Sequence, residues 1–161
     1  MNRCTIAIGL AALAFLPAAA AAATARVEFE NPGAFTDAGR PRPQAVRSES
    51  VEALRDHLER EISRRLPAGQ TLHVWITDVD LAGDFEPTQR YSNEVRIVRD
   101  RYPPRIELRF RLVGADGSSV KAGTRTLRDG AFLLHGLPDQ QDALRYEKAM
   151  INRWLEAEFW R

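Results

Sequence analysis

Cysteine is nearly absent from this sequence. Cys4 is the only cysteine among 161 residues, so the chain after it has neither a disulfide framework nor a thiol nucleophile. Lysine is almost as rare, since only Lys121 and Lys148 occur, and arginine supplies the other basic charges. A domain of this kind depends on its apolar core, and its guanidinium groups are suited to planar pairs with the many carboxylates.

An excess of charge of either sign is also missing. The chain has 23 lysines and arginines against 22 aspartates and glutamates. Arg3 is the only charged residue among the first 25, so residues 26–161 carry 22 charges of each sign. Proteins that bind nucleic acid through electrostatics show a basic excess, so we expect no nucleic-acid partner. The length suits one domain, which we place at residues 26–161.

Long apolar runs are absent from the chain after residue 25, but one such run opens it. Arg3 precedes a nearly unbroken apolar segment at residues 4–16, and a series of alanines follows. This order is typical of a secretory signal peptide. We predict that residues 1–25 are removed by cleavage between Ala25 and Arg26. The protein would then be periplasmic or secreted, with no transmembrane segment after cleavage.

The remaining sequence alternates between strand and helix patterns. Four segments have the composition or alternation of strands and a fifth is weaker: 26–30, 71–79, 105–113, 119–127 and, less clearly, 94–100. Apolar residues at helical spacing follow Ser48 or Ser50, and again follow Asp139 or Asp142, which are possible caps. We predict an α+β fold, with a single antiparallel sheet of four or five strands and two helices packed on one face.

Signatures of catalysis are missing as well. The sequence has no serine in a nucleophile elbow, no phosphate-binding glycine loop and no zinc motif. Its acidic residues concentrate instead in one run: Asp78, Asp80, Asp84 and Glu86. Clustered carboxylates suit a hard cation such as Ca²⁺, but a calcium loop would need ligands where Ala82 and Gln89 stand. We therefore expect no metal and no cofactor, and keep a non-standard cation site as an alternative.

The acidic run has two further interpretations. Asp78 and Asp80 could act as an acid/base pair, although no companion nucleophile is nearby. The alternation of their strand places both on its apolar face, where an unpaired carboxylate would be costly. They must therefore pair with arginines, cap backbone N–H groups or lie beyond a bulge that ends the strand. We favour this structural role.

Glu147 raises the same question on the last helical segment. It lies between Leu144, Ile151 and Trp154, near the middle of the apolar stripe. We predict that Glu147 is partly buried and bonded to an arginine of the sheet. The candidate arginines are Arg96, Arg105 and Arg125.

The polar faces of the strands collect basic and aromatic side chains. The members of this set are His73, Trp75, Arg109, Arg111, Lys121 and Arg125. A basic sheet face with an aromatic residue could bind a polyanion. The balanced net charge favours the alternative, a solvated face with cross-strand pairs.

Several short motifs are spread in order over most of residues 27–160: FTD at 35–37, LPAGQTL at 66–72, TDVDLAGD at 77–84, EP at 86–87, YPPRI at 102–106, ADG at 115–117 and RYEK at 145–148 with Trp154. Together they resemble the domain-of-unknown-function 3016 family of proteobacterial exported proteins. The resemblance implies a small secreted α+β domain. It implies no activity, cofactor or catalytic residue.

Two functional hypotheses follow. The first is a non-enzymatic periplasmic binding or accessory module of the cell envelope, whose partner could be an envelope protein or a polyanionic glycan. The alternative is a carboxylate- or metal-dependent hydrolase that uses the Asp78–Glu86 cluster. Geometry separates them, because catalytic carboxylates should converge on an open cavity without neutralising arginines, whereas structural ones should be bonded.

Overall fold

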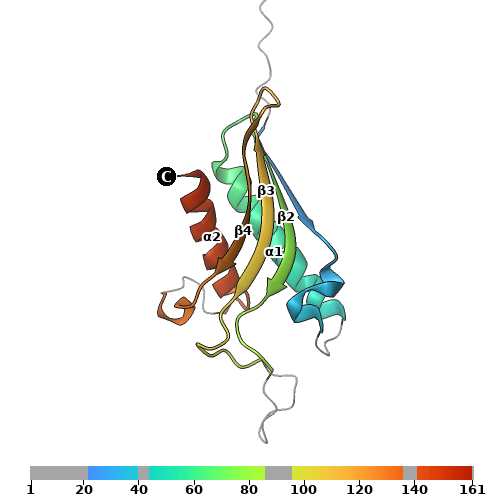
Figure 1. Ribbon diagram of the computed structural model, residues 1–161, viewed down its shortest axis with the longest axis vertical. Helices are drawn as coiled ribbons and strands as arrows, with labels where there is room; N and C mark the ends of the chain where they lie inside the picture. The colour runs from blue at the N-terminus through green and yellow to red at the C-terminus, as the bar shows by residue number, and fades with distance from the viewer. Residues whose placement is uncertain (1–21, 40–43, 86–95, 136–140, 161) are drawn as a thin grey trace, which may run out of the picture.

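Four strands and two long helices make up the fold in the computed structural model, which describes residues 22–39, 44–85, 96–135 and 141–160 (Figure 1). The strands are β1 (Thr24–Phe29), β2 (Thr71–Asp80), β3 (Arg105–Val113) and β4 (Ser119–Arg128). The helices are α1 (Gln44–Arg65) and α2 (Arg145–Phe159), and three short 3-10 helices are η1 (Pro32–Ala34), η2 (Thr36–Gly39) and η3 (Phe132–Leu134). The α+β class and a four-stranded sheet are therefore as predicted.

The strand directions correct the predicted sheet, which is mixed rather than antiparallel. Its order is β1-β2-β3-β4, and β1 pairs with β2 in parallel whereas the other two pairs are antiparallel. The reason is α1, which lies between β1 and β2 in the chain and supplies the crossover that a parallel pair needs. A fifth strand at 94–100 does not form within its described part, 96–100, where Ile97 makes an isolated bridge to Asp84. Residues 94 and 95 lie outside the described residues.

Both helices cover the same face of the sheet, and the core lies between them and the strands (Figure 1). The alternating apolar side chains of β2 and β3 point into it, together with Val27 of β1. Leu58 and Ile62 of α1 and Ile151 and Leu155 of α2 close the core from the other side. In the part of the chain that the structure describes, no helix covers the opposite face of the sheet. No helix in the described part of the chain combines the length and apolar character that a bilayer crossing needs.

A bulge near the end of β2 decides where its acidic residues lie. Ile76 pairs with Leu108, but the register then shifts so that Asp78 pairs with Glu107. Val79 consequently enters the core at 5% exposure, and Asp78 and Asp80 turn to the face without helices. Strand alternation alone had placed both aspartates on the core face. A bulge that ends the strand was one of the alternatives considered for them, and the structure contains that bulge.

The first strand begins earlier than the sequence suggested. Thr24 pairs with Thr71, and its N–H donates to the carbonyl of Gln70 at 3.0 Å. Ala23 and Ala25 pack against the core. The bond between Ala25 and Arg26, where we expected cleavage, therefore lies inside β1.

Candidate functional site

Asp78 fixes the segment after β1 to the end of the sheet. Its Oδ1 accepts from the Thr36 N–H and its Oδ2 from the Thr36 hydroxyl, both at 2.7 Å. The guanidinium of Arg105 donates to the same Oδ2 at 2.6 Å. Burial alone would raise the pKa of Asp78, but the two bonds from Thr36 and the charge of Arg105 lower it below the ordinary value. Asp78 is therefore held ionised in a structural role.

Asp37 and Arg96 form a second connection beside the first. Asp37 Oδ2 accepts from the Leu81 N–H at 3.1 Å and from Arg96 Nη2 at 2.5 Å. Arg96 Nη1 donates to the carbonyls of Ala82 and Gly83 at 2.9 and 3.2 Å. The side chains of Asp37 and Arg96 are only 13% and 17% exposed, respectively. Together they hold the loop after β2 by its backbone, a role for Asp37 that no chemical signature in the sequence had indicated, although it belongs to the FTD motif.

Glu147 completes this network from α2. It is 1% exposed, and its Oε1 accepts from the Ala82 N–H at 2.6 Å. Burial raises the pKa of Glu147, although the bond from Ala82 and the charge of Arg96 oppose that rise. We call the group formed by Asp37, Arg96, Ala82 and Glu147 the carboxylate network.

The predicted direct bond between Glu147 and an arginine was wrong. Arg105 binds Asp78 and Glu107, and Arg125 binds Glu158 of α2. Arg96 is the nearest to the prediction, because it holds the carbonyl of Ala82 while Glu147 holds its N–H. Among the described residues, Glu147 Oε2 and Arg96 Nε are buried without a hydrogen-bond partner. The helix had correctly indicated burial, but it could not indicate that a backbone group would be the partner.

Asp80 and Asp84 line one polar cavity, whereas the carboxylate of Asp78 is already bonded to Thr36 and Arg105. This cavity has a volume of about 230 Å³, and the charged residues that line it are Asp37, Asp80, Asp84, Arg101, Arg105 and Arg128. Burial, then the neighbouring Asp37 and Asp78, raise the pKa of Asp80 against the effect of Arg105. Glu86 lies outside the described residues. Within those residues, no three histidine, cysteine, aspartate or glutamate side chains are placed to hold a metal ion.

The loop at Asp84 is shaped by its backbone. The N–H and carbonyl of Asp84 bond to Ile97 at 3.0 and 2.8 Å, and Asp84 Oδ1 accepts from the N–H of Phe85. Gly83 has a φ of +89°, and a Cβ there would lie 2.8 Å from the carbonyl oxygen of Ile97. Glycine is required at this close approach. Asp84 thus serves to build the loop.

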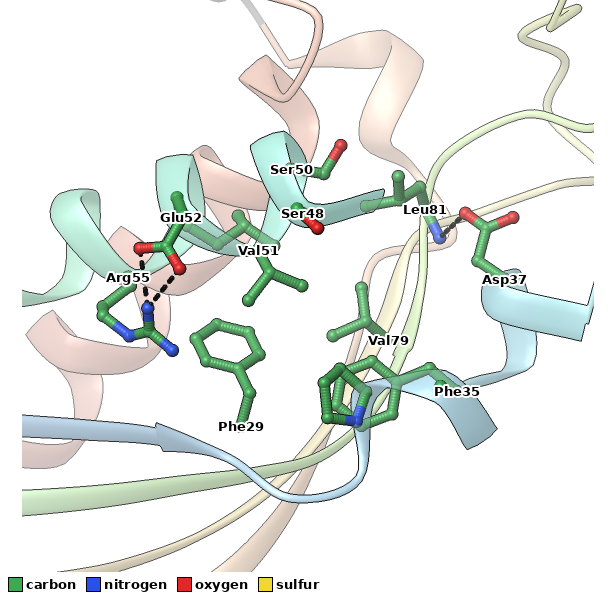
Figure 2. Close-up of a pocket in the computed structure, with 13 residues that line it drawn as sticks. Phe29, Phe35, Asp37, Ser48, Ser50, Val51, Glu52, Arg55, Val79 and Leu81 are labelled. Atoms are coloured by element: carbon green, nitrogen blue, oxygen red, sulfur yellow. Dashed lines mark hydrogen bonds and ion pairs between the residues drawn. The ribbon is translucent and has the colours of Figure 1, made fainter. Parts of the chain in front are cut away.

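An apolar cavity of about 230 Å³ lies beside the carboxylate network (Figure 2). It is enclosed by the first turns of α1, the end of β1, η1 and the end of β2. The apolar side chains that line it are Phe29, Pro32, Phe35, Val51, Leu54, Val79 and Leu81. Ser48, Ser50 and Asp37 add polar groups to the lining. A mainly apolar lining with a few placed polar groups is typical of a ligand-binding cavity.

Hydrogen bonds and a ring contact hold the residues that line this cavity in place. Asp37 lines the cavity and also holds the N–H of Leu81, which is another lining residue. On the opposite side, Arg55 donates to both carboxylate oxygens of Glu52 at 2.6 Å, and its guanidinium lies 5.3 Å from the centre of the Phe29 ring (Figure 2). Sequence reasoning missed the cavity, because helical spacing showed Val51 and Leu54 only as core positions.

Only part of the predicted basic set lies on one face of the sheet. Trp75 pairs with Arg109 and His73 with Arg111 on the face without helices. Lys121 and Arg125 instead pair with Leu112 and Leu108, which point toward the helices. There Lys121 Nζ and Arg125 Nε contact the carboxylate of Glu158 at 2.7 and 2.8 Å. The error arose because β4 has almost no apolar alternation, so its two faces could not be told apart from the sequence.

Three basic residues lie side by side on neighbouring strands, on the face of the sheet without helices. Arg26 of β1 is the register partner of His73, which is in turn the partner of Arg111. We call these three residues the basic row. Burial first, and then the charges of Arg26 and Arg111, lower the pKa of His73. Neither arginine forms a hydrogen bond or ion pair with another described residue. Arg26 was missed because it lies at the expected cleavage bond.

Comparison with known proteins adds a family and one distant structure. The family model described as "Protein of unknown function (DUF3016)" matches residues 23–157. A comparison with curated proteins finds no match. Among solved structures, the PelC dodecamer from Paraburkholderia phytofirmans is similar at 14% identity, over 84% of this chain and 83% of that chain, with a TM-score of 0.31. At that score the likeness carries no argument about this chain.

Proposed function

The chain belongs to the DUF3016 family of proteins of unknown function, as its motifs had indicated, and we propose that it is an exported, non-enzymatic binding module of the cell envelope. Its binding site is the apolar cavity between α1, β1 and β2. The ligand would be an apolar group, such as an aliphatic or aromatic side chain of an envelope protein. The preformed cavity carries this proposal.

The lining of the cavity supports binding because it is held in place before any ligand arrives. Phe35 and Val79 are each 5% exposed and belong to the core, so their positions are fixed by packing. Asp37 holds the backbone of Leu81 on the same wall. A preorganised site does not have to lose conformational entropy when it binds, which favours affinity.

The bonds that Asp78 and Asp37 already make favour a binding role over hydrolysis. Asp78 is neutralised by Arg105 and bonded twice to Thr36, and Asp37 is neutralised by Arg96. A general base needs a carboxylate that can reach a substrate proton, and these two carboxylates already accept bonds from the chain. We therefore do not assign Asp78 to catalysis.

The cavity can be tested directly with small apolar probes. Methyl-labelled protein would be titrated with indole and, separately, with isobutanol while NMR spectra are recorded. We expect shifts at the methyl groups of Val51, Leu54 and Val79, which line the cavity, and none at Leu112, which lies in the core away from it. Equal shifts at all four residues, or none, would contradict a site at this cavity.

The function requires a partner in the cell, which photocrosslinking can capture. A photoreactive residue at Ser48, which lines the cavity, should give a specific adduct, whereas one at Arg60, exposed on α1, should not. Val51→Trp would fill the cavity and should abolish the Ser48 adduct. Ser50→Trp provides a second blocking variant if the first unfolds the protein. Adducts that persist in a folded blocked variant would argue against the cavity.

The residue at which β1 begins refines the predicted position of signal-peptide cleavage. Cleavage between Ala25 and Arg26 would remove two residues of β1 and the bond from Thr24 to Gln70. We expect the mature protein to keep the strand, so cleavage should fall before Ala23, where alanines still satisfy the small-residue requirement. The intact mass of protein recovered from the periplasm gives the position. Recovery of uncleaved protein in the cytoplasm alone would contradict export.

A further inference from the structure

The face of the sheet without helices carries a second site. We propose that the basic row, Arg26, His73 and Arg111, binds the carboxylate or sulfate groups of an acidic polysaccharide. The cavity proposed above opens elsewhere, beside α1, so the two sites are independent.

The sheet register brings the three basic side chains together. Residues paired in register lie side by side on neighbouring strands, and strands are about 4.8 Å apart. The Cα atoms of Arg26 and Arg111 are therefore separated by about 10 Å, with His73 between them. Arginine side chains are long enough to converge from that distance on one anionic group above His73.

These arginines differ from their neighbours because their charge is not already neutralised. Arg109 on the same face forms an ion pair with Glu30, and Arg105 binds Asp78 and Glu107. Arg26 and Arg111 are exposed, and no described residue accepts a hydrogen bond from either. Two unneutralised guanidinium groups are complementary to an anion, which they can bind through paired N–H donors.

The acidic side chains around the row leave room for an anionic ligand. Glu30 is bound by Arg109. Glu28 lies in the next row, as the register partner of Trp75, and is exposed. Its effect on His73 is smaller than that of either arginine. The local potential at the row is therefore positive, although the whole chain is nearly neutral.

The rest of the face favours a polysaccharide over other polyanions. Thr77, Thr124 and Thr126 are exposed on or beside this polar face and offer hydroxyl groups to a sugar. The Trp75 ring is fixed, since it stacks on His73 with centroids 5.6 Å apart and lies 5.3 Å from the Arg109 guanidinium. Proteins that bind nucleic acid electrostatically usually carry a larger basic surface than these three residues, and the nearly neutral chain provides no such excess.

Affinity for immobilised heparin and for soluble polygalacturonate tests the site. Heparin carries sulfates and polygalacturonate carries carboxylates, and neutral dextran is the blank. We expect Arg26→Glu/Arg111→Glu to weaken binding at low salt by about a hundredfold, since two charge-assisted bonds are lost and each is worth about tenfold. Titration with polygalacturonate should shift the ring resonances of His73, because the anion lies over it.

The matched control is Arg60→Glu/Arg64→Glu, which makes the same change in net charge on the exposed side of α1. It should bind nearly as well as the unchanged protein, and so should the cavity variant Val51→Trp. Equal loss in the Arg60/Arg64 control would overturn the site in favour of non-specific attraction. Binding to phosphatidylglycerol vesicles without binding to polygalacturonate would also overturn it, because the ligand would then be a membrane surface.

Discussion

The arginines at the end of the sheet and those on its face without helices are the same chemical group in opposite situations. Arg96 is 17% exposed and donates to Asp37 and to two backbone carbonyls. Arg26 and Arg111 are exposed and have no hydrogen-bonded partner among the described residues. A count of charges cannot separate these situations. What separates structural charge from charge available to a ligand is whether its bonds are already made.

The two groups of arginines should also differ in their contribution to the free energy of unfolding. Removing one partner of a buried ion pair leaves the other charge desolvated and costs about 3–5 kcal/mol, whereas an exposed pair contributes about 0–1 kcal/mol. Substitutions that leave a buried charge or N–H group without its partner should therefore lower the free energy of unfolding strongly in the carboxylate network, whereas substitutions in the basic row should barely change it. The four predictions below follow that gradient.

Arg96→Met should have the largest effect. It leaves Asp37 without its cation and the carbonyls of Ala82 and Gly83 without their donor, so we expect a loss of about 3–5 kcal/mol in urea unfolding. Adding Asp37→Asn, which removes the unpaired charge but keeps an acceptor for Leu81, should recover part of that loss. A cost for Arg96→Met near zero would show that the network is not structural.

Glu147 separates the effect of charge from that of a hydrogen bond. Glu147→Ala leaves the Ala82 N–H buried without an acceptor and should cost about 1–3 kcal/mol. Glu147→Gln keeps the acceptor. Because burial raises the pKa of Glu147 above its ordinary 4.5, the ionised form destabilises the folded state increasingly as pH rises from 4.5 through the folded pKa.

The measurement is urea unfolding of both Glu147 variants between pH 4.5 and pH 8. Glu147→Gln should be more stable than the unchanged protein at pH 7, and this advantage should shrink as pH falls toward 4.5. Glu147→Ala should be less stable throughout. If Glu147→Gln is the less stable protein at pH 7, then the attraction to Arg96 outweighs burial and the pKa direction is wrong.

Much of the fold could be read from alternation, but its strand directions could not. The regular alternation at Arg105–Val113 predicted the bounds of β3, because one face is buried against both helices. Alternation carries no information about the direction of the neighbouring strand, so the parallel pair of β1 and β2 was missed. Its cause is the long connection through α1, which had been predicted as a helix but not weighed as a crossover.

The candidate site was harder to predict because it depends on backbone partners. The acidic run and the burial of Glu147 were visible from residue types and spacing. Their partners were not, since the N–H groups of Thr36 and Ala82 have no signature in the sequence. The bulge before Asp78 also reverses the face of every later residue in β2, and one unpaired residue is enough to do so.

Asp78 should show an intermediate effect with the opposite pH dependence from Glu147. Asp78→Asn removes the charge that Arg105 and Thr36 stabilise, and we expect a cost of about 1 kcal/mol at pH 7. The pKa of Asp78 is below its ordinary 3.8, so its contribution is present above 3.8 and lost as pH falls through the folded value. Urea unfolding at pH 7 and near pH 3 should show the cost decrease at the lower pH; a cost independent of pH would mean that lost shape, not charge, is responsible.

Arg26→Ala/Arg111→Ala should change stability least, because the two arginines make no bond that the fold uses. We expect a change within about 0.5 kcal/mol at pH 8. The variant still has a measurable consequence at His73, since its pKa is lowered by burial and then by these two charges.

His73 can report that consequence by NMR titration. In the unchanged protein the folded state resists protonation of His73, so this residue contributes stability above pH 6.5 that is lost as pH falls through its lowered folded pKa. Removing Arg26 and Arg111 should raise that pKa toward 6.5, so the variant should lose less stability on acidification than the unchanged protein. Burial remains in the variant, so the pKa should stay below 6.5. An unchanged pKa would show that the two guanidinium groups lie too far from His73 to share one anion with it, and the basic row would then lose its geometric basis.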